Sequence, residues 1–282
     1  MNNKIFIHIG FGRTSTTTLQ TNIFYQLVKF KNINYIYGKS FLINNNFYND
    51  NFDKEKKYKL YLSEIEKIKK LNDNDIFLSD EGLISEGFWS PSTYENKLKM
   101  NLDYFGSEAN IIISIRKPSD WLSSIYRKFS NGKSTKEFFL DEKTYYNATY
   151  KEKFLIENFS YENILKKYSK NFKNVYIVKY EEIKNFDFLK NIFKLDSNEI
   201  NLIKDIYSKV KLRQSLSFYG YKFELLIDKL DNYINLRKYI NVNVERVDRY
   251  LQKILPSKKI NVNFNNLPIN IEKLDEIYKL IK

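Results

Sequence analysis

The chain has 282 residues, of which 43% are apolar and 17% aromatic, so it can bury a substantial core. It has no cysteine and a single histidine, His8, which excludes disulfides, thiolate metal sites and a cysteine nucleophile, and makes a Ser-His-Asp triad nearly impossible. The formal net charge is +13, but the lysines are scattered along the chain, so we expect no nucleic-acid partner.

Short apolar runs alternate with helical patterns through the first 180 residues. The predicted strands are Lys4–Ile9, Asn34–Tyr37, Asp75–Ser79, Asn110–Ile115 and Val175–Lys179. The predicted helices between them are Thr16–Phe30, Lys54–Leu71, Tyr94–Tyr104, Pro118–Asn131 and Lys151–Tyr168. This alternation favours a three-layer α/β/α fold with a central parallel sheet.

Beyond Tyr180 the pattern becomes helical. The predicted helices there are Phe186–Phe193, Ser197–Tyr207, Ser217–Leu230, Val242–Leu255 and Ile271–Ile281. No repeat and no Pro/Gly/Ser-rich linker interrupts the chain, so we expect one domain over residues 1–282, with an α/β core at 1–180 and a helical extension at 181–282. Two segments, Gly38–Asp53 and Gly132–Tyr150, have an irregular pattern and are predicted to be long loops, which on an α/β scaffold commonly carry substrate recognition.

The hydropathy pattern indicates where in the cell the protein is expected. No window approaches eighteen apolar residues, so no membrane span is expected. The apolar run Ile5–Ile9 is too short for a secretory leader, and we expect a cytoplasmic protein. The excess positive charge could steer an anionic small molecule, or hold the protein near an acidic glycan or membrane surface.

The most informative segment is residues 5–20, where the strand Ile5–Ile9 runs into Gly10-Phe11-Gly12 and then a helix. A cation and a run of hydroxyl residues open that helix: Arg13, Thr14, Ser15, Thr16, Thr17 and Thr18. A tight turn, a helix N-terminus and these side chains together form a typical phosphate cradle. The Gly-Lys-Ser/Thr of an NTP-binding P-loop is absent, and Ser15 stands where a dinucleotide fingerprint has its third glycine.

A second segment, residues 109–129, reads as a buried strand that ends at Arg116 and a helix that opens near Pro118. Arg116 therefore leaves the carboxyl end of the strand, the edge at which open α/β sheets bind ligands. Ser124 follows eight residues later, about two turns into the helix, where it can face the same edge.

Together the two segments resemble the sulfotransferases that use 3′-phosphoadenosine 5′-phosphosulfate (PAPS), in particular the bacterial, glycan- or carbohydrate-type domains. The resemblance implies a P-loop NTPase-like fold, with Gly12 and the run from Arg13 to Thr18 around the 5′-phosphate and sulfuryl group. It assigns Arg116 and Ser124 to the 3′-phosphate. Arg213, in Arg213-Gln214-Ser215-Leu216-Ser217, resembles a residue of the segment that closes over the nucleotide.

The loop departs from the family pattern at two positions. Arg13 replaces the usual lysine, and Thr14-Ser15-Thr16 replaces Thr-Gly-Thr. If the middle residue needs a positive φ, Ser15 must pay a modest strain that glycine would avoid.

The resemblance also suggests catalytic roles. Glu81 follows the strand Asp75–Ser79, as does the presumed base of glycan-type enzymes, with Asp80 as a weaker alternative. Arg13 would neutralise charge on the bridging oxygen. His8 is a less favoured base, because its place inside the first strand is typical of a packed residue.

Three aromatic positions complete the sequence-based assignments. Tyr180, with Glu181, resembles a mainly structural Tyr-Glu pair of the family. Trp89 and Trp121 are interpreted as core, with Trp121 a candidate to pack beside the adenine.

The expected function is transfer of a sulfuryl group from PAPS to a hydroxyl acceptor, with 3′-phosphoadenosine 5′-phosphate (PAP) released and no metal required. The acceptor implied by the resemblance is a sugar of a surface glycan or glycolipid. Two alternatives stay open at this point: a P-loop nucleotide kinase or NTPase, and a catalytically inactive protein that binds PAPS or PAP.

Overall fold

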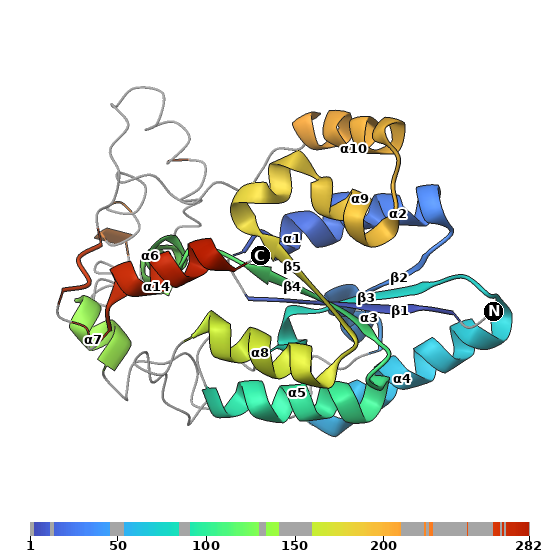
Figure 1. The fold of residues 1–282 in the computed structure, drawn as a ribbon, viewed down its shortest axis with the longest axis horizontal. Coiled ribbons are helices and arrows are strands. Elements are labelled where there is room, and N and C mark those ends of the chain that lie inside the picture. The colour runs from blue at the N-terminus through green and yellow to red at the C-terminus, as the bar shows by residue number, and fades with distance from the viewer. Residues whose placement is uncertain are drawn as a thin grey trace.

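The computed structural model describes residues 3–11, 14–45, 54–84, 91–129, 134–140, 160–209, 262–265, 267 and 269–281, and the single positions 223, 226, 227 and 247. At its centre is a five-stranded sheet with the order β2-β3-β1-β4-β5 (Figure 1). The strands are β1 (Ile5–Gly10), β2 (Asn34–Tyr37), β3 (Ile76–Ser79), β4 (Asn110–Ile115) and β5 (Asn174–Lys179).

All neighbouring strands of the sheet are parallel. The central strand β1 pairs His8 with Ser79 of β3 on one side and Gly10 with Ser114 of β4 on the other. The Ile-rich strand β4 is buried along its whole length, as expected of a parallel strand covered on both faces. Every strand therefore ends at the same edge of the sheet, and the loops that leave this edge lie side by side.

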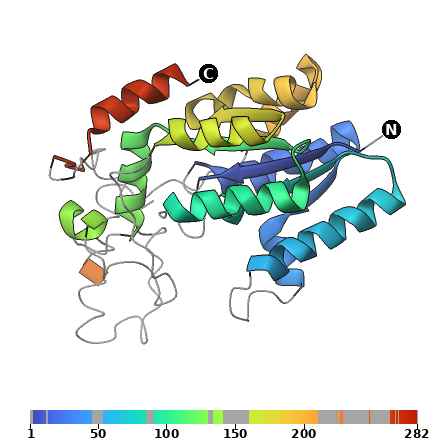
Figure 2. The same ribbon diagram turned by 60° about the horizontal axis from the view of Figure 1, so that its bottom comes forward.

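Helices cover both faces of the sheet, so the predicted three-layer α/β/α architecture is confirmed (Figures 1 and 2). The side chains of β1 alternate between two apolar clusters, with Ile7 and Ile9 in one and Phe6 in the other. The helices that contribute to the Ile7 cluster include α4 (Lys54–Leu71), α5 (Pro91–Phe105) and α8 (Tyr161–Asn171). Those that contribute to the Phe6 cluster are α2 (Phe24–Lys31), α9 (Asp187–Phe193) and α10 (Ser197–Lys209).

A further group of helices, α6 (Pro118–Phe129), α7 (Thr135–Leu140) and α14 (Ile271–Leu280), lies beyond the carboxyl ends of the strands (Figure 1). Asp275 of α14 accepts a hydrogen bond from the backbone N–H of Ser119 at 3.0 Å and pairs with Lys117 at 3.2 Å. A carboxylate is favourable at the positive end of a helix dipole. The last described helix is thus fastened to the start of α6, next to the strand end that carries Arg116.

The two segments predicted as loops each contain a helix, which corrects that prediction. In the first, α3 (Gly38–Asn44) packs Phe41 against Tyr61, with ring centroids 5.4 Å apart, and buries Leu42. In the second, α7 buries Phe138 and Phe139. Burial of these apolar side chains outweighs the loop-like composition of the polar residues around them.

The helix predicted at Thr16–Phe30 is divided. It consists of α1 (Thr16–Thr18), a π-helical segment (Leu19–Ile23) and α2. The helices predicted at Ser217–Leu230 and Val242–Leu255 lie almost entirely outside the described residues, as do residues 151–159 of the helix predicted before β5.

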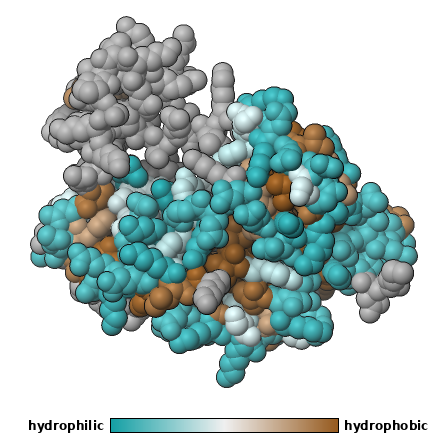
Figure 3. Space-filling model, turned by 45° about the horizontal axis from the view of Figure 1, so that its top comes forward, coloured by the Kyte–Doolittle hydropathy of each residue, from teal (hydrophilic) through white to brown (hydrophobic). Residues whose placement is uncertain are grey.

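The surface is mainly hydrophilic, with a band of hydrophobic residues across the face shown in Figure 3. Large apolar side chains that are exposed include Tyr25 and Val28 of α2 and Leu202 of α10. Of the helices in the described ranges, none has both the length and the apolar character needed to cross a membrane.

Candidate active site

The loop after β1 folds back tightly over the strand end. A Cβ atom at Gly10 would lie 2.3 Å from the Cγ2 methyl of Thr16 and 3.3 Å from the His8 ring, so only glycine fits there. The buried Thr14 donates both its N–H (3.2 Å) and its hydroxyl (2.5 Å) to the carbonyl of Phe11. The Thr14 hydroxyl is therefore used inside the loop. Gly12 and Arg13, which the sequence assigns to this loop, lie outside the described residues.

Ser15 has a positive φ, so it carries the strain expected of a non-glycine residue at this position. Its φ and ψ are 62° and 18°, in the left-handed region, although it is not a glycine. This conformation costs about 1–2 kcal/mol for a residue with a Cβ. The Ser15 carbonyl accepts the N–H of Leu19 at 3.0 Å, so the strained residue is the one that turns the chain into the helix. Strain of this kind is commonly retained at functional sites.

The hydroxyl residues of the loop differ in their surroundings. Thr16 is 2% exposed, and its hydroxyl donates to Glu81 Oε1. Thr17 is exposed and Thr18 half-buried at the start of the helix. Glu81 opens a 3₁₀ turn (Glu81–Leu83) directly after β3, the strand that pairs with β1. The Thr16–Glu81 contact therefore joins the loop after β1 to the carboxylate after β3.

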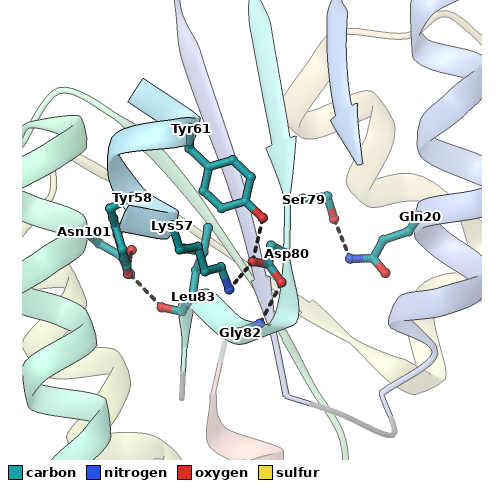
Figure 4. A network of polar contacts seen from close by, with 9 residues as sticks. All are labelled: Gln20, Lys57, Tyr58, Tyr61, Ser79, Asp80, Gly82, Leu83 and Asn101. Atoms are coloured by element: carbon teal, nitrogen blue, oxygen red, sulfur yellow. Dashed lines mark hydrogen bonds and ion pairs between the residues drawn. The ribbon is translucent and has the colours of Figure 1, made fainter. Parts of the chain in front are cut away.

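Asp80, beside Glu81, is engaged by a buried network (Figure 4). Its carboxylate lies 2.5 Å from Lys57 Nζ and accepts hydrogen bonds from the Tyr61 hydroxyl and the Gly82 N–H, both at 2.9 Å. Burial raises the pKa of Asp80, but the Lys57 ammonium and these hydrogen bonds outweigh burial and hold the pKa below its usual value. Asp80 is thus an ion-paired carboxylate rather than a solvated one, and it caps the turn that carries Glu81.

His8 is completely buried in the middle of the sheet. Nδ1 lies 2.7 Å from Ser79 Oγ of β3, and Nε2 lies 2.7 Å from Ser114 Oγ of β4. The ring also meets Phe24 edge-on, with centroids 4.9 Å apart. Burial lowers the pKa of His8 to about 3, and the opposing effect of Asp80 is smaller. The ring is therefore neutral near pH 7 and links three adjacent strands.

Arg116 leaves β4 at the carboxyl edge and stacks on an aromatic ring. Its guanidinium carbon lies 4.3 Å from the centroid of Tyr180, the residue that follows β5. The next residue, Glu181, accepts a hydrogen bond from the hydroxyl of Tyr278 on α14. The Tyr-Glu pair therefore has two contacts of different kinds, one that orients Arg116 and one that holds the last described helix.

Ser124 and Trp121 lie on α6. Ser124 is 2% exposed, and Trp121 is fully buried. The Trp121 ring meets Phe11 of the loop, with centroids 5.8 Å apart, and Tyr161 of α8 at 6.2 Å. Trp121 thus packs the helix against the loop after β1. Trp89 and Arg213 lie outside the described residues.

The strand order brings three of the predicted residues to neighbouring positions. Glu81 follows β3, Thr16 belongs to the segment after β1, and Arg116 follows β4, while β3, β1 and β4 are adjacent in the sheet. Adjacent strands lie about 4.8 Å apart, so the ends of β3 and β4 are separated by about 10 Å, with the β1 loop between them. A carboxylate, a hydroxyl-rich loop and an arginine consequently share one edge.

Sequence reasoning missed Lys57, Tyr61 and the contact between Tyr180 and Arg116. Lys57 precedes Tyr61 by four residues, and Tyr61 precedes Ile65 by four, which places all three on one face of α4. The spacing of Lys57 with two large apolar residues is the signal that could have placed it on the buried face of α4. In the structure Tyr61 and Ile65 are fully buried, and Lys57 is buried with them. No comparable signal predicts the Tyr180 contact, which depends on the packing of β4 beside β5.

Within the part of the chain that the structure describes, no group of three or more His, Cys, Asp or Glu side chains is arranged to hold a metal ion. The carboxylates nearest the loop, Asp80 and Glu81, contact Lys57 and Thr16 respectively.

No protein-family model matches the sequence, and no curated protein sequence matches it. Solved structures similar to the chain include mouse sulfotransferase SULT7A1 complexed with PAP, at 17% identity and TM-score 0.38, covering 73% of this chain. The match spans 64% of that mouse protein.

Two further solved structures are similar to the chain. One is retinol dehydratase in complex with androsterone and the inactive cofactor PAP, with 13% identity, coverage of 96% of this chain and 83% of that one, and a TM-score of 0.36. The other is a gluconokinase from Sinorhizobium meliloti 1021, with 7% identity, coverage of 73% and 97%, and a TM-score of 0.28.

Proposed function

We propose that the protein is a PAPS-dependent sulfotransferase that transfers a sulfuryl group to a hydroxyl acceptor. The observation that carries the proposal is the order of the three strand ends, in which the loop after β1 lies between Glu81 after β3 and Arg116 after β4. A donor with phosphate at two positions needs two anion-binding elements, and an acceptor hydroxyl needs a base on the side of the transferred group. The strand order supports the proposal, because it brings Glu81, the loop after β1 and Arg116 to one edge of the sheet.

In the proposed complex the loop binds the 5′ end of the donor. Arg13, Ser15, Thr17 and Thr18 would contribute charge, hydroxyls and the N–H groups of the first helical turn to the 5′-phosphate and sulfuryl group. Thr14 would act differently, because its hydroxyl is donated to Phe11 and helps to shape the loop.

Arg116 would bind the 3′-phosphate with its planar set of donors, and Ser124 would add a hydroxyl. Stacking on Tyr180 fixes the plane of the Arg116 guanidinium, which reduces the conformational entropy lost on binding. Arg213 would close over the nucleotide.

The proposed reaction is an in-line displacement at sulfur. The acceptor oxygen forms a bond to sulfur, the bond from sulfur to the bridging phosphate oxygen breaks, and PAP leaves with that electron pair. Glu81 accepts the acceptor proton, and Arg13 stabilises the charge that develops on the bridging oxygen. His8 is a poor candidate for the base, because its ring is enclosed between Ser79 and Ser114.

The proposed acceptor is a hydroxyl of a sugar in a surface glycan or glycolipid. The chain would act as one cytoplasmic domain, with a core of residues 1–180 and a helical extension of residues 181–282. The extension would contact the nucleotide. The contact of α14 with the start of α6 supports that assignment, because it ties the extension to the helix that carries Ser124.

The experiment compares PAP with Mg-ATP in a thermal-shift assay without added metal in the PAP arm. A ligand at about 100 times its Kd should stabilise the protein by about 2.7 kcal/mol. Stabilisation by PAP, followed by transfer of radiolabelled sulfate from PAPS to a member of a glycan panel, is the expected result. Stabilisation by Mg-ATP alone would favour a kinase instead, and PAP binding without turnover on any acceptor would favour an inactive binding protein.

A further inference from the structure

The short turn that carries Glu81, together with the preceding Asp80, is held by side chains of other elements at both of its ends. We call residues 80–83 the Glu81 turn. At its start Asp80 accepts from Tyr61 and the Gly82 N–H and pairs with Lys57. At its end the carbonyl of Leu83 accepts from Asn101 Nδ2 at 2.9 Å (Figure 4).

Asn101 is itself fixed in place. Its Oδ1 accepts from the Tyr58 hydroxyl at 2.7 Å, and its Nδ2 lies 3.1 Å from the Tyr168 hydroxyl. Asn101, Tyr58 and Tyr168 are all buried, so these hydrogen bonds are protected from water. Side chains from helices α4, α5 and α8 therefore form one hydrogen-bonded network that ends on the Glu81 turn.

Two glycines leave room for the charged pair. A Cβ at Gly82 would lie 2.6 Å from Lys57 Nζ, and a Cβ at Gly38 would lie 2.5 Å from the Tyr61 hydroxyl and 2.6 Å from Asp80 Cβ. Any larger residue would displace the ammonium or the carboxylate. The backbone on both sides is thus shaped around the Lys57–Asp80 pair.

The pair is also costly to keep, because Lys57 is only 5% exposed. Removing both charges from water carries a desolvation penalty that the attraction between them offsets only with good geometry. Asp80 and Glu81 are consecutive, with Cα atoms about 3.8 Å apart, so an unpaired Asp80 would repel a charged Glu81.

We propose that Lys57, acting with Tyr61 through Asp80, is a positioning residue that fixes Glu81 on Thr16 and neutralises the adjacent carboxylate, so that Glu81 alone is available to take a proton. This inference rests on the proposed function for its purpose, but the arrangement can be tested without turnover. It divides two neighbouring carboxylates into a structural one and a reactive one, as paired acids with different environments do in other enzymes.

The charged and titratable groups around the Glu81 turn determine the sign of each effect. Lys57 and Tyr61 approach from α4 and the neutral His8 from β1, and Lys97 of α5 lies 5.4 Å from the centroid of the Tyr58 ring. Loss of Lys57 leaves Asp80 negative and should raise the pKa of Glu81. Loss of the Asp80 charge removes a negative charge next to Glu81 and should lower the pKa of Glu81.

The test follows the side-chain carboxyl carbons of glutamate by NMR as a function of pH, with the Glu81 signal assigned from Glu81→Gln. We expect Lys57→Met to raise the Glu81 pKa by about one unit, Asp80→Asn to lower it by about one, and the double variant to return it close to wild type. Lys59→Met is the matched control: Lys59 is on the same helix but pairs with Glu55 at the surface, so the Glu81 signal should not move.

Equal Glu81 titrations in wild type, Lys57→Met and Asp80→Asn would overturn the proposal. If Lys57→Met does not fold, Asp80→Asn is compared with the double variant, where removal of Lys57 should raise the Glu81 pKa by about one unit. Identical titrations of those two proteins would again overturn it. The outcome is separable from the proposed function, which fails if PAP does not bind, whereas a failure here leaves PAP binding by the wild type intact.

Discussion

Thr16 donates its hydroxyl to Glu81, although the two residues follow different strands and are 65 positions apart in the sequence. The loop after β1 and the carboxylate after β3 are therefore one unit rather than two neighbouring features. A group that binds the donor and a group that accepts a proton need a fixed separation, because reaction rates depend strongly on alignment. The hydrogen bond provides that coupling.

Substitution of Glu81 by glutamine should separate proton transfer from binding. Glutamine keeps an oxygen that can accept from Thr16 but cannot take a proton, so turnover should fall by about 10²–10⁴-fold. The Kd for PAP should stay within a few-fold of wild type. PAP release from PAPS with an acceptor taken from a glycan panel gives the rate, and calorimetry gives the Kd. Retention of full turnover would show that another residue is the base.

Ser15 offers a test of backbone strain. Because φ is 62°, Ser15→Gly should be more stable than Ser15→Ala by about 1 kcal/mol. At Thr17, in regular helical conformation, the order should be reversed, with alanine more stable than glycine by about 1 kcal/mol. Urea denaturation of the four variants measures both differences. The same order at both positions would contradict a left-handed Ser15.

The buried His8 should make the fold sensitive to acid. Its pKa is about 3 in the folded state and about 6.5 when unfolded, so the unfolded chain binds a proton in this interval and the folded chain does not. The stability from neutral His8 is complete above pH 6.5 and is lost as the pH falls toward 3, at up to about 1.4 kcal/mol per pH unit. His8→Asn should lack this part of the slope. Parallel stability curves for the two proteins would refute the assignment.

The stacking of Arg116 on Tyr180 predicts a graded effect on nucleotide binding. Tyr180→Phe keeps the ring and should bind PAP like the wild type, whereas Tyr180→Leu should weaken PAP several-fold, in line with about 0.5–1 kcal/mol for a cation–π contact. Calorimetric titration of both variants with PAP measures the effect. Equal binding by the leucine variant would mean that the ring does not position Arg116.

The parallel sheet and its strands could be predicted from the sequence because buried strands leave a strong local signal. The Ile-rich strand Asn110–Ile115 has the predicted bounds, and so does the strand Asn34–Tyr37. The left-handed conformation at Ser15 could be suspected only because the family pattern has a glycine at that position. The residue Ser15 itself carries no signal for a positive φ. The helix at Gly38–Asn44 was missed, because its stability comes from packing of Phe41 on Tyr61, a contact outside its own sequence.

The positions of Glu81 and Arg116 just after two strands could be predicted, but the contacts around these residues could not. The pairing of Asp80 with Lys57, a residue 23 positions earlier, depends on how α4 packs beside β3. The stack of Arg116 on Tyr180 depends on the neighbouring positions of β4 and β5. Long-range packing decides such contacts, and local sequence patterns carry little information about them.

Binding of the 3′-phosphate by Arg116 is tested by measuring the affinities of the wild type and of Arg116→Ala for two ligands. The ligands are PAP and adenosine 5′-monophosphate, which lacks the 3′-phosphate. If Arg116 reads the 3′-phosphate, Arg116→Ala should weaken PAP by about 10²-fold, in line with loss of charge-assisted hydrogen bonds worth about 1.5–3 kcal/mol. The affinity for adenosine 5′-monophosphate should stay within about two-fold. Equal losses of affinity for both ligands, or a wild type that does not prefer PAP, would contradict the assignment of Arg116 to the 3′-phosphate.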